Sequence, residues 1–183
     1  MKPNWFVAYP VAPTGWFETL IQTAPDNMRR FPADDLHLTL AFFGGVDEAD
    51  ARRGWAQALR DPPEALRVRF GPVEPFGNPR KPSAFGLTLS QGREAVCEVL
   101  KHRGDAILQA AGCKPARRPP RPHVTLARPP YKARQADRQA ALSWSERAAT
   151  PEVEVALDTL ALYTWAHDRR QRLFRVVESR PLT

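Results

Sequence analysis

Two short segments of the same form, His-x-Thr-Leu, constrain this chain more than any other feature. They are His37–Leu40 and His123–Leu126, and their histidines lie 86 positions apart, at 37 and 123. In a β-strand, successive side chains point to opposite faces, so the histidine and the threonine of each segment share one face and the other two residues share the opposite face. Each segment is therefore predicted to be a strand with a polar pair above an apolar anchor, and the two strands are expected to be equivalent parts of two related lobes.

The remaining sequence mixes strand-like and helix-like patterns. Predicted strands cover 5–11, 36–43, 66–70, 84–89, 123–127, 153–157, 159–165 and 173–177. Predicted helices cover 16–23, 47–59 and 93–111, while 131–147 fits either a loop or a helix, and the Pro- and Gly-rich stretch 71–83 is predicted to be a hairpin loop. This order, without a Gly-x-Gly-x-x-Gly fingerprint after a strand, indicates an α+β architecture rather than a doubly wound nucleotide-binding fold.

The length and net charge of the chain limit the number of domains and the kind of partner to be expected. A chain of 183 residues fits one domain, 1–183, and its 27 Lys and Arg against 20 Asp and Glu give a formal charge of +7, which favours a polyanionic partner. Arginine-rich proteomes produce the same balance, so the placement of the charges matters more. Arginines precede both His-x-Thr-Leu segments; they are Arg29, Arg30, Arg117, Arg118 and Arg121.

Secretion, membrane insertion and disulfide chemistry are not indicated. The chain contains no run of 18 apolar residues, and its first residues lack the long apolar segment of a signal peptide, so a cytoplasmic protein is expected. Cys97 and Cys113 are the only cysteines and form no Cys-x-x-Cys pattern, which is typical of free packing thiols.

Two opposed histidines suit the cleavage of a cyclic phosphodiester. That reaction needs a base to take a proton from water and an acid to protonate the leaving oxygen on the other side of phosphorus, and threonine hydroxyls can donate to the phosphate oxygens. One His-x-Thr alone is more often a structural histidine, but two copies make coincidence less plausible. A metal site is the alternative; Asp34 and Asp35 adjoin the first segment, whereas no acid adjoins the second.

With these segments the sequence resembles the two-histidine (2H) phosphoesterases, and among them the RNA 2′,3′-cyclic phosphodiesterases of the ThpR or LigT type. The resemblance extends to the aromatic segment 5–8, the extended segment 36–44 with its Phe-Phe-Gly ending, and Leu162-Tyr163. It implies a bilobal α+β fold of two pseudo-symmetric lobes, in which two antiparallel sheets line a central cleft and helices pack outside. It implies no metal and no cofactor.

The resemblance also implies roles for particular residues. His37 would be the proton donor to the departing 3′ oxygen and His123 the proton acceptor that activates water, leaving a 2′-phosphomonoester. Thr39 and Thr125 would bind phosphate oxygens, Arg128 would add positive charge, and Phe42 would stack on a terminal base. Strict alternation places the fifth residue after each histidine on the opposite face, so Phe42 and Arg128 reach the cleft only where each strand ends or bulges.

Three hypotheses remain open at this point. The first is an enzyme that hydrolyses RNA 2′,3′-cyclic phosphate ends, tRNA fragments among them, or cyclic nucleotides, acting as a monomer. The second is an RNA-end-binding module with little or no catalysis. The third keeps the histidine pair but changes the reaction to a 2′,5′-linked or ADP-ribose cyclic phosphate substrate, or to reversible 2′,5′ ligation of RNA. His102 and His167 lack a following threonine and are predicted to be surface residues.

Overall fold

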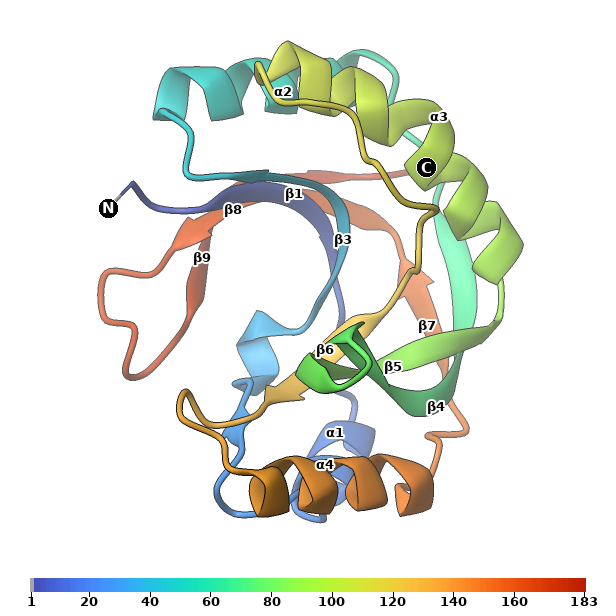
Figure 1. Cartoon of the computed structure of the whole chain (residues 1–183). Helices are drawn as coiled ribbons and strands as arrows, with labels where there is room; N and C mark the ends of the chain where they lie inside the picture. Colours follow the sequence, from blue (N-terminus) through green and yellow to red (C-terminus); the bar gives the residue numbers. More distant parts are fainter. Residues whose placement is uncertain (1) are drawn as a thin grey trace.

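The computed structural model describes residues 2–183 as an α+β fold, as predicted (Figure 1). The helices are α1 (Trp16–Ile21), α2 (Glu48–Arg60), α3 (Arg93–Ala110) and α4 (Gln135–Arg147), with the 3₁₀ helix η1 (Ala33–Asp35). The strands are β1 (Trp5–Pro10), β2 (Arg29–Arg30), β3 (His37–Gly44), β4 (Leu66–Asn78), β5 (Lys81–Gln91), β6 (Val124–Arg128), β7 (Glu154–Leu157), β8 (Thr159–Trp165) and β9 (Phe174–Pro181).

The strands form one antiparallel sheet whose two halves meet at a narrow junction. Its order is β7-β4-β5-β6-β3-β1-β8-β9, with β2 added on β6. We call β7-β4-β5-β6 with β2 the β6 half, and β3-β1-β8-β9 the β3 half. The paired residues that join β3 to β6 are Leu38 and Val124. The two expected sheets are therefore joined as halves of a single sheet, and the chain crosses between them several times, so neither half is a continuous segment.

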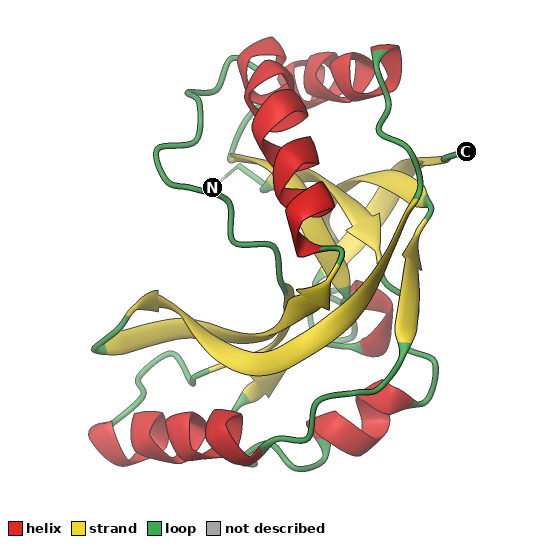
Figure 2. Ribbon diagram, turned by 90° about the vertical axis from the view of Figure 1, so that its right-hand side faces the viewer, coloured by secondary structure: helices red, strands yellow, loops and turns green. Residues whose placement is uncertain are grey.

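Helices cover the outer faces of both halves. In the β3 half, α2 packs on β1 and α3 packs on β3, while α4 packs on β4 and β5 in the β6 half (Figure 2). Side chains from both halves fill one apolar core, in which Val7, Leu38 and Val124 are fully buried. The opposite face of β1 carries a second, smaller cluster that contains Phe6 and Tyr163. Both faces of β1 are therefore buried, and this strand is the centre of the β3 half.

The segment between the two predicted hairpin strands is not a loop. β4 continues to Asn78 and β5 begins at Lys81, so 71–83 is mostly strand. Its prolines and glycines are accommodated because the β4–β5 register shifts three times, once between Phe70 and Val73. Such bulges remove the ladder bonds that a proline cannot make. The prediction of a loop was wrong because it rested on the Pro- and Gly-rich composition of the segment. In the structure, pairing between β4 and β5 determines its conformation.

Most other elements agree with the sequence prediction within one or two residues. The ambiguous stretch 131–147 contains the helix α4, which begins at Gln135. At its N-terminus, the backbone N–H of Arg134 donates a hydrogen bond to the Asp137 carboxylate at 2.7 Å. In residues 2–183, no helix combines the length and the apolar character that crossing a membrane requires.

The junction between the halves yields a stability prediction. Leu38 is fully buried where β3 pairs with β6, so Leu38→Ala leaves a cavity beneath both His-x-Thr-Leu segments. We expect it to lower the free energy of unfolding by about 2–5 kcal/mol, measured by urea unfolding. The matched control is Leu59→Ala on α2, where the side chain is 36% exposed and the expected loss is about 1 kcal/mol or less. Equal losses in the two variants would contradict the importance of this junction.

Candidate active site

The junction of β3 and β6 brings the two His-x-Thr pairs onto one face. Leu38 is paired with Val124 in antiparallel register. Extending this register by one residue in each direction places His37 opposite Thr125 and His123 opposite Thr39. Directly opposite residues of an antiparallel pair share a face, and Leu38 and Val124 are buried on the other face. The two histidines and the two threonines therefore form one polar group across the junction.

A β-bulge lies at the last residue of each His-x-Thr-Leu segment. In β3, Val7 pairs with Ala41 but its neighbour Ala8 pairs with Thr39, so Leu40 is the extra residue. The bulged strand turns its following side chains to the other face. Phe42 is accordingly 56% exposed on the side of His37, and both rings approach Phe6, with centroids at 6.3 and 4.7 Å.

The bulge in β6 has the same effect on Arg128. Phe85 pairs with Ala127 while Gly86 pairs with Thr125, which makes Leu126 the extra residue. Leu126 and Ala127 are both fully buried, and Arg128 is exposed. The charge of Arg128 lowers the pKa of both His37 and His123. The requirement that each strand bulge before the fifth residue is met in both strands.

A close approach of β5 beneath β6 is part of this arrangement. Gly86 lies opposite Thr125, and a Cβ atom at this position would lie 2.6 Å from the Val124 carbonyl oxygen. Only glycine lets the two backbones come this close. Gly86 thus positions the strand that follows His123.

Both histidine rings are oriented by a backbone carbonyl two residues before them. Nδ1 of His37 lies 2.6 Å from the Asp35 carbonyl oxygen, and Nδ1 of His123 lies 2.7 Å from the Arg121 carbonyl oxygen. A carbonyl oxygen can only accept, so Nδ1–H is the donor in both contacts. This fixes the tautomer, and Nε2 of each neutral ring keeps a lone pair for proton transfer.

The ring of His37 lies among three aromatic side chains. Phe6, Tyr163 and Phe174 surround it at centroid distances of 4.7, 5.5 and 5.5 Å, and Phe174 meets the ring edge-on. Burial in these surroundings lowers the pKa of His37 from its ordinary 6.5 to about 4, although the contact with Asp35 raises it. His37 is therefore neutral at pH 7 when no ligand is bound.

His123 stacks on a single aromatic ring. The ring of Phe76 lies parallel to it with centroids 3.9 Å apart, and the guanidinium of Arg121 lies 4.5 Å from the same Phe76 ring. Arg121 is held by Glu74 at 3.0 Å. Burial lowers the pKa of His123 below its ordinary value, and the charges of Arg121 and Arg128 lower it further.

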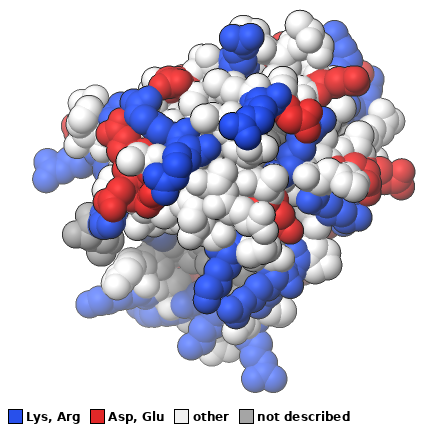
Figure 3. Space-filling view, turned by 90° about the horizontal axis from the view of Figure 1, so that it is seen from above, with Lys and Arg blue, Asp and Glu red and all other residues white. Residues whose placement is uncertain are grey.

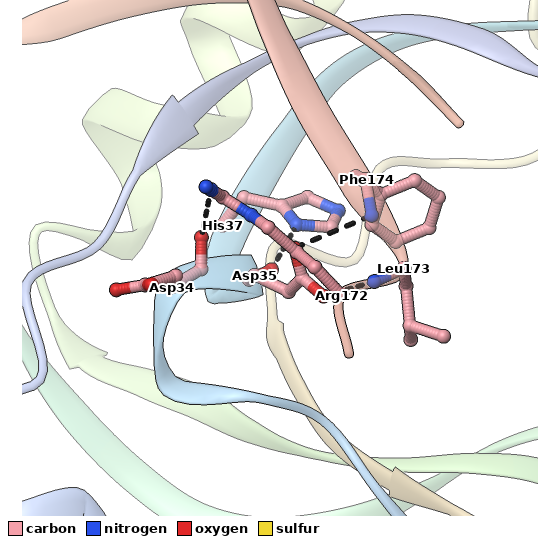
Figure 4. A network of polar contacts seen from close by, with 6 residues as sticks. All are labelled: Asp34, Asp35, His37, Arg172, Leu173 and Phe174. Carbon is pink, nitrogen blue, oxygen red and sulfur yellow. Dashed lines mark hydrogen bonds and ion pairs between the residues drawn. The ribbon is translucent and has the colours of Figure 1, made fainter. Parts of the chain in front are cut away.

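Asp35 links the first histidine to β9 through a network of polar contacts (Figure 4). Its carboxylate is fully buried and accepts hydrogen bonds from the Arg172 side chain at 3.1 Å and from the backbone N–H groups of Leu173 and Phe174 at 2.6 and 3.3 Å. The same residue supplies the carbonyl that accepts from His37. One buried acid thus positions both the ring of His37 and the start of β9, whose Phe174 packs against that ring.

The substrate-binding side chains predicted from the sequence have no strong protein partners. Within residues 2–183, the hydroxyls of Thr39 and Thr125 make no hydrogen bond, and Arg128 forms no ion pair and lies 5.5 Å from the ring of Phe31. Desolvation of the guanidinium by neighbouring residues, followed by repulsion from Arg29 and Arg169, lowers the pKa of Arg128. These groups are free to bind an anion, and an anion would relieve the repulsion between the arginines.

The acids near the first histidine are not arranged as a metal site. Among residues 2–183, no three His, Cys, Asp or Glu side chains are grouped so that they could hold a metal ion. The Asp35 carboxylate, considered as a ligand from the sequence, is occupied by Arg172 and two backbone N–H groups.

Sequence reasoning missed the supporting residues of the site. Phe6, Phe76, Tyr163 and Phe174 contact the histidine rings, and Asp35 holds one of them, but these residues lie on strands far apart in the sequence. The only signal in the sequence was the aromatic character of the segments 5–8 and 162–163. His102 is confirmed as a surface residue, paired with Glu98 on α3. Trp55 and Trp144 are buried packing groups.

Known proteins are similar to this chain in sequence and in fold. A Bacillus subtilis (strain 168) protein named RNA 2′,3′-cyclic phosphodiesterase is 28% identical over 135 residues, which cover 70% of this chain and 72% of that protein. The structure of E. coli LigT complexed with 3′-AMP has a TM-score of 0.73 at 22% identity and covers 100% of this chain and 99% of that one. A Thermus thermophilus protein, TT0787, has a TM-score of 0.70 at 21% identity, covering 98% of this chain and 97% of that one.

The family follows from a match that spans most of the sequence. The model of the 2′-5′ RNA ligase superfamily matches residues 12–169, a range that contains both His-x-Thr-Leu segments. The structural neighbours have the same fold over nearly the whole chain. The chain therefore belongs to the 2′-5′ RNA ligase superfamily, a family of two-histidine phosphoesterases.

Proposed function

We propose that this protein hydrolyses the 2′,3′-cyclic phosphate ends of RNA to 2′-phosphomonoesters, by acid–base catalysis with His37 and His123 and without a metal ion. The observation that carries the proposal is the pair of histidine rings near one face of the junction, each with Nδ1 bound to a carbonyl and Nε2 unengaged. The name of the Bacillus subtilis relative supports the same substrate.

The proposed reaction assigns one proton transfer to each histidine. Nε2 of His123 takes a proton from water, and the water oxygen attacks phosphorus opposite the 3′ oxygen. The bond from phosphorus to the 3′ oxygen breaks, and protonated His37 donates its Nε2 proton to that oxygen. Thr39 and Thr125 donate to the nonbridging oxygens, and Arg128 stabilises the negative charge that grows on them.

Phe42 completes the proposed substrate site. Its ring is exposed beside Phe6, on the same face as His37, and offers a flat surface to the terminal base. We further propose that the protein works as a monomer in the cytoplasm, on RNA ends that include tRNA fragments. Reversible 2′,5′ ligation is a second candidate activity because the matching family model carries that description.

Replacement of either histidine tests the catalytic assignment. We expect His37→Ala and His123→Ala each to lower kcat on a 2′,3′-cyclic nucleotide by ~10²–10⁴-fold, because each removes one proton transfer. The control is His102→Ala, which changes an exposed histidine on α3 and is expected to keep full activity. Circular dichroism checks that the fold persists, and EDTA is expected to leave wild-type turnover unchanged. Full activity in either active-site variant, or loss on chelation, would overturn the proposal.

The lowered pKa values of His37 and His123 predict that kcat/KM is highest at acidic pH. The pH profile of kcat/KM reports the free enzyme, in which the pKa of His37 is about 4 and that of His123 lies below 6.5. One ring must be protonated and the other neutral, so kcat/KM is expected to peak between the pKa values of the two rings, and therefore below pH 6.5. Above both values it falls about tenfold per pH unit, because the singly protonated pair becomes rarer.

A replacement of Phe174 tests whether the aromatic surroundings of His37 cause its low pKa. Phe174→Leu removes the ring that meets His37 edge-on and admits water, so the pKa of His37 rises toward 6.5. The acidic limb of the kcat/KM profile is expected to move to higher pH. An optimum above pH 7 in the wild-type protein, or an unchanged acidic limb in Phe174→Leu, would contradict this explanation.

A further inference from the structure

A basic groove lies beyond the end of β6, outside the residues assigned to the reaction. It has a volume of about 240 Å³ and is bounded by β2, the start of β5, the loop after β6, and α4. Arg29, Lys81, Arg138 and Tyr131 are its charged and aromatic lining residues. In Figure 2, the tip of the β4–β5 hairpin and the helix α4 extend in the same direction away from the sheet. The groove therefore involves segments that are far apart in the sequence.

The positive charge of this groove is not neutralised. No acidic side chain lines it, and among residues 2–183 none of Arg29, Lys81 and Arg138 takes part in an ion pair. Arg29 and Arg138 donate only to backbone carbonyls, at 3.1 and 3.3 Å. The neighbouring Asp137 carboxylate contacts Asn27 and the Arg134 backbone instead.

The wider surface shows where such charge is compensated. Seen from above, Lys and Arg prevail along the lower edge of the molecule, which is the front of Figure 1, whereas both signs mix over the helices α2 and α3 (Figure 3). Cations on those helices form ion pairs, for example Arg53 with Asp50 and Lys101 with Glu98. Three unpaired cations around one groove therefore point to an anionic ligand.

An exposed aromatic ring specifies the kind of anion. The side chain of Tyr131 is 89% exposed, the most exposed of the large hydrophobic residues, and it lies within the basic groove. Basic grooves with exposed aromatic rings bind single-stranded nucleic acids, because the cations follow the phosphates and the rings stack on bases. An acidic peptide would use the cations but leave the ring without a partner.

The groove continues directly from the candidate active site. Arg29 of β2 is paired with Arg128 of β6, and the Arg29 side chain donates to the carbonyl of Pro129, which also lines the groove. Pro129 follows Thr125 by four residues, or about 10 Å along the strand when the bulged Leu126 is left out. This is farther than one nucleotide bound at the histidines extends, so the groove is placed for the residues upstream of the terminal one.

We propose that this groove binds the phosphodiester backbone of the RNA strand on the 5′ side of its cyclic phosphate end, with Tyr131 stacked on an upstream base. The inference rests on the proposed function and deepens it, because it makes an RNA strand a better substrate than a cyclic mononucleotide. A mononucleotide occupies the histidine site and leaves the groove empty.

Kinetics with two substrates test the groove. We expect wild-type kcat/KM to be higher for an oligoadenylate ending in a 2′,3′-cyclic phosphate than for 2′,3′-cyclic AMP. Lys81→Ala/Arg138→Ala is expected to lower kcat/KM on the oligonucleotide about tenfold, through KM, while turnover of cyclic AMP stays unchanged. Tyr131→Ala has a similar effect and Tyr131→Phe, which keeps the ring, has none. Lys101→Ala on α3 is the matched control for the loss of an exposed cation.

Binding separates the groove from the chemistry. Fluorescence anisotropy with a labelled oligoadenylate ending in a 3′-phosphate is expected to show weaker binding in Lys81→Ala/Arg138→Ala, with the salt dependence of log Kd reduced by about one per lost cation. Groove-dependent binding without turnover of either cyclic substrate would overturn the proposed function and keep the groove. Turnover of both substrates at equal kcat/KM, with binding unchanged in the variants, would overturn the groove and keep the function. Equal displacement of the oligonucleotide by a polyglutamate peptide would overturn RNA as its ligand.

Discussion

The antiparallel pairing of Leu38 with Val124 is the constraint on which the candidate site depends. It joins the two halves of the sheet, and its register decides which side chains lie opposite each other across the junction. A shift by one residue in either strand would move a histidine to the core face. The buried leucine and valine resist that shift, because it would expose them and bury an imidazole. The apolar residues of the two motifs thus maintain the geometry of the polar ones.

Around this junction, each histidine is fixed by a different set of contacts. His37 depends on Asp35, which connects η1 to the start of β9 and brings Phe174 against the ring. His123 depends on Arg121, whose carbonyl binds Nδ1 and whose guanidinium reaches Phe76, the ring on which His123 stacks. The carbonyl contact is common to both sites, while the aromatic surroundings differ. Asp35 and Arg121 therefore orient the two rings and affect their pKa values. The difference in aromatic surroundings explains why His37 is the more strongly desolvated ring.

Local patterns in the sequence were sufficient for most of the strands, the main helices and the two His-x-Thr pairs, because strand alternation and helix ends depend on residues that are neighbours in the sequence. The two-residue strand β2 was not predicted. The bulges at Leu40 and Leu126 were anticipated only as a requirement, since an unbroken apolar run does not show which residue lacks a partner. The extension of β4 through 71–78 was missed because its stability comes from pairing with β5 rather than from its own composition. The equivalence of two lobes stays a prediction, and the bulge at the same position of both motifs supports it.

The electrostatics of the unliganded site favour a coupling between substrate and proton. Desolvation and the charge of Arg128 lower the pKa of both histidines, so both rings are neutral at pH 7 in the free protein. The proposed reaction nevertheless needs one of them as an imidazolium. In the proposed reaction, the phosphate diester carries a negative charge between the two rings, and an anion within reach raises the pKa of a histidine. By linkage, a group whose pKa rises on binding takes up a proton on binding. In the proposed reaction, substrate binding is therefore accompanied by the uptake of a proton from solvent, and affinity is expected to increase as the pH falls toward the pKa of the free rings. The free enzyme, in turn, does not hold an unpaired buried cation beside Phe6 and Tyr163.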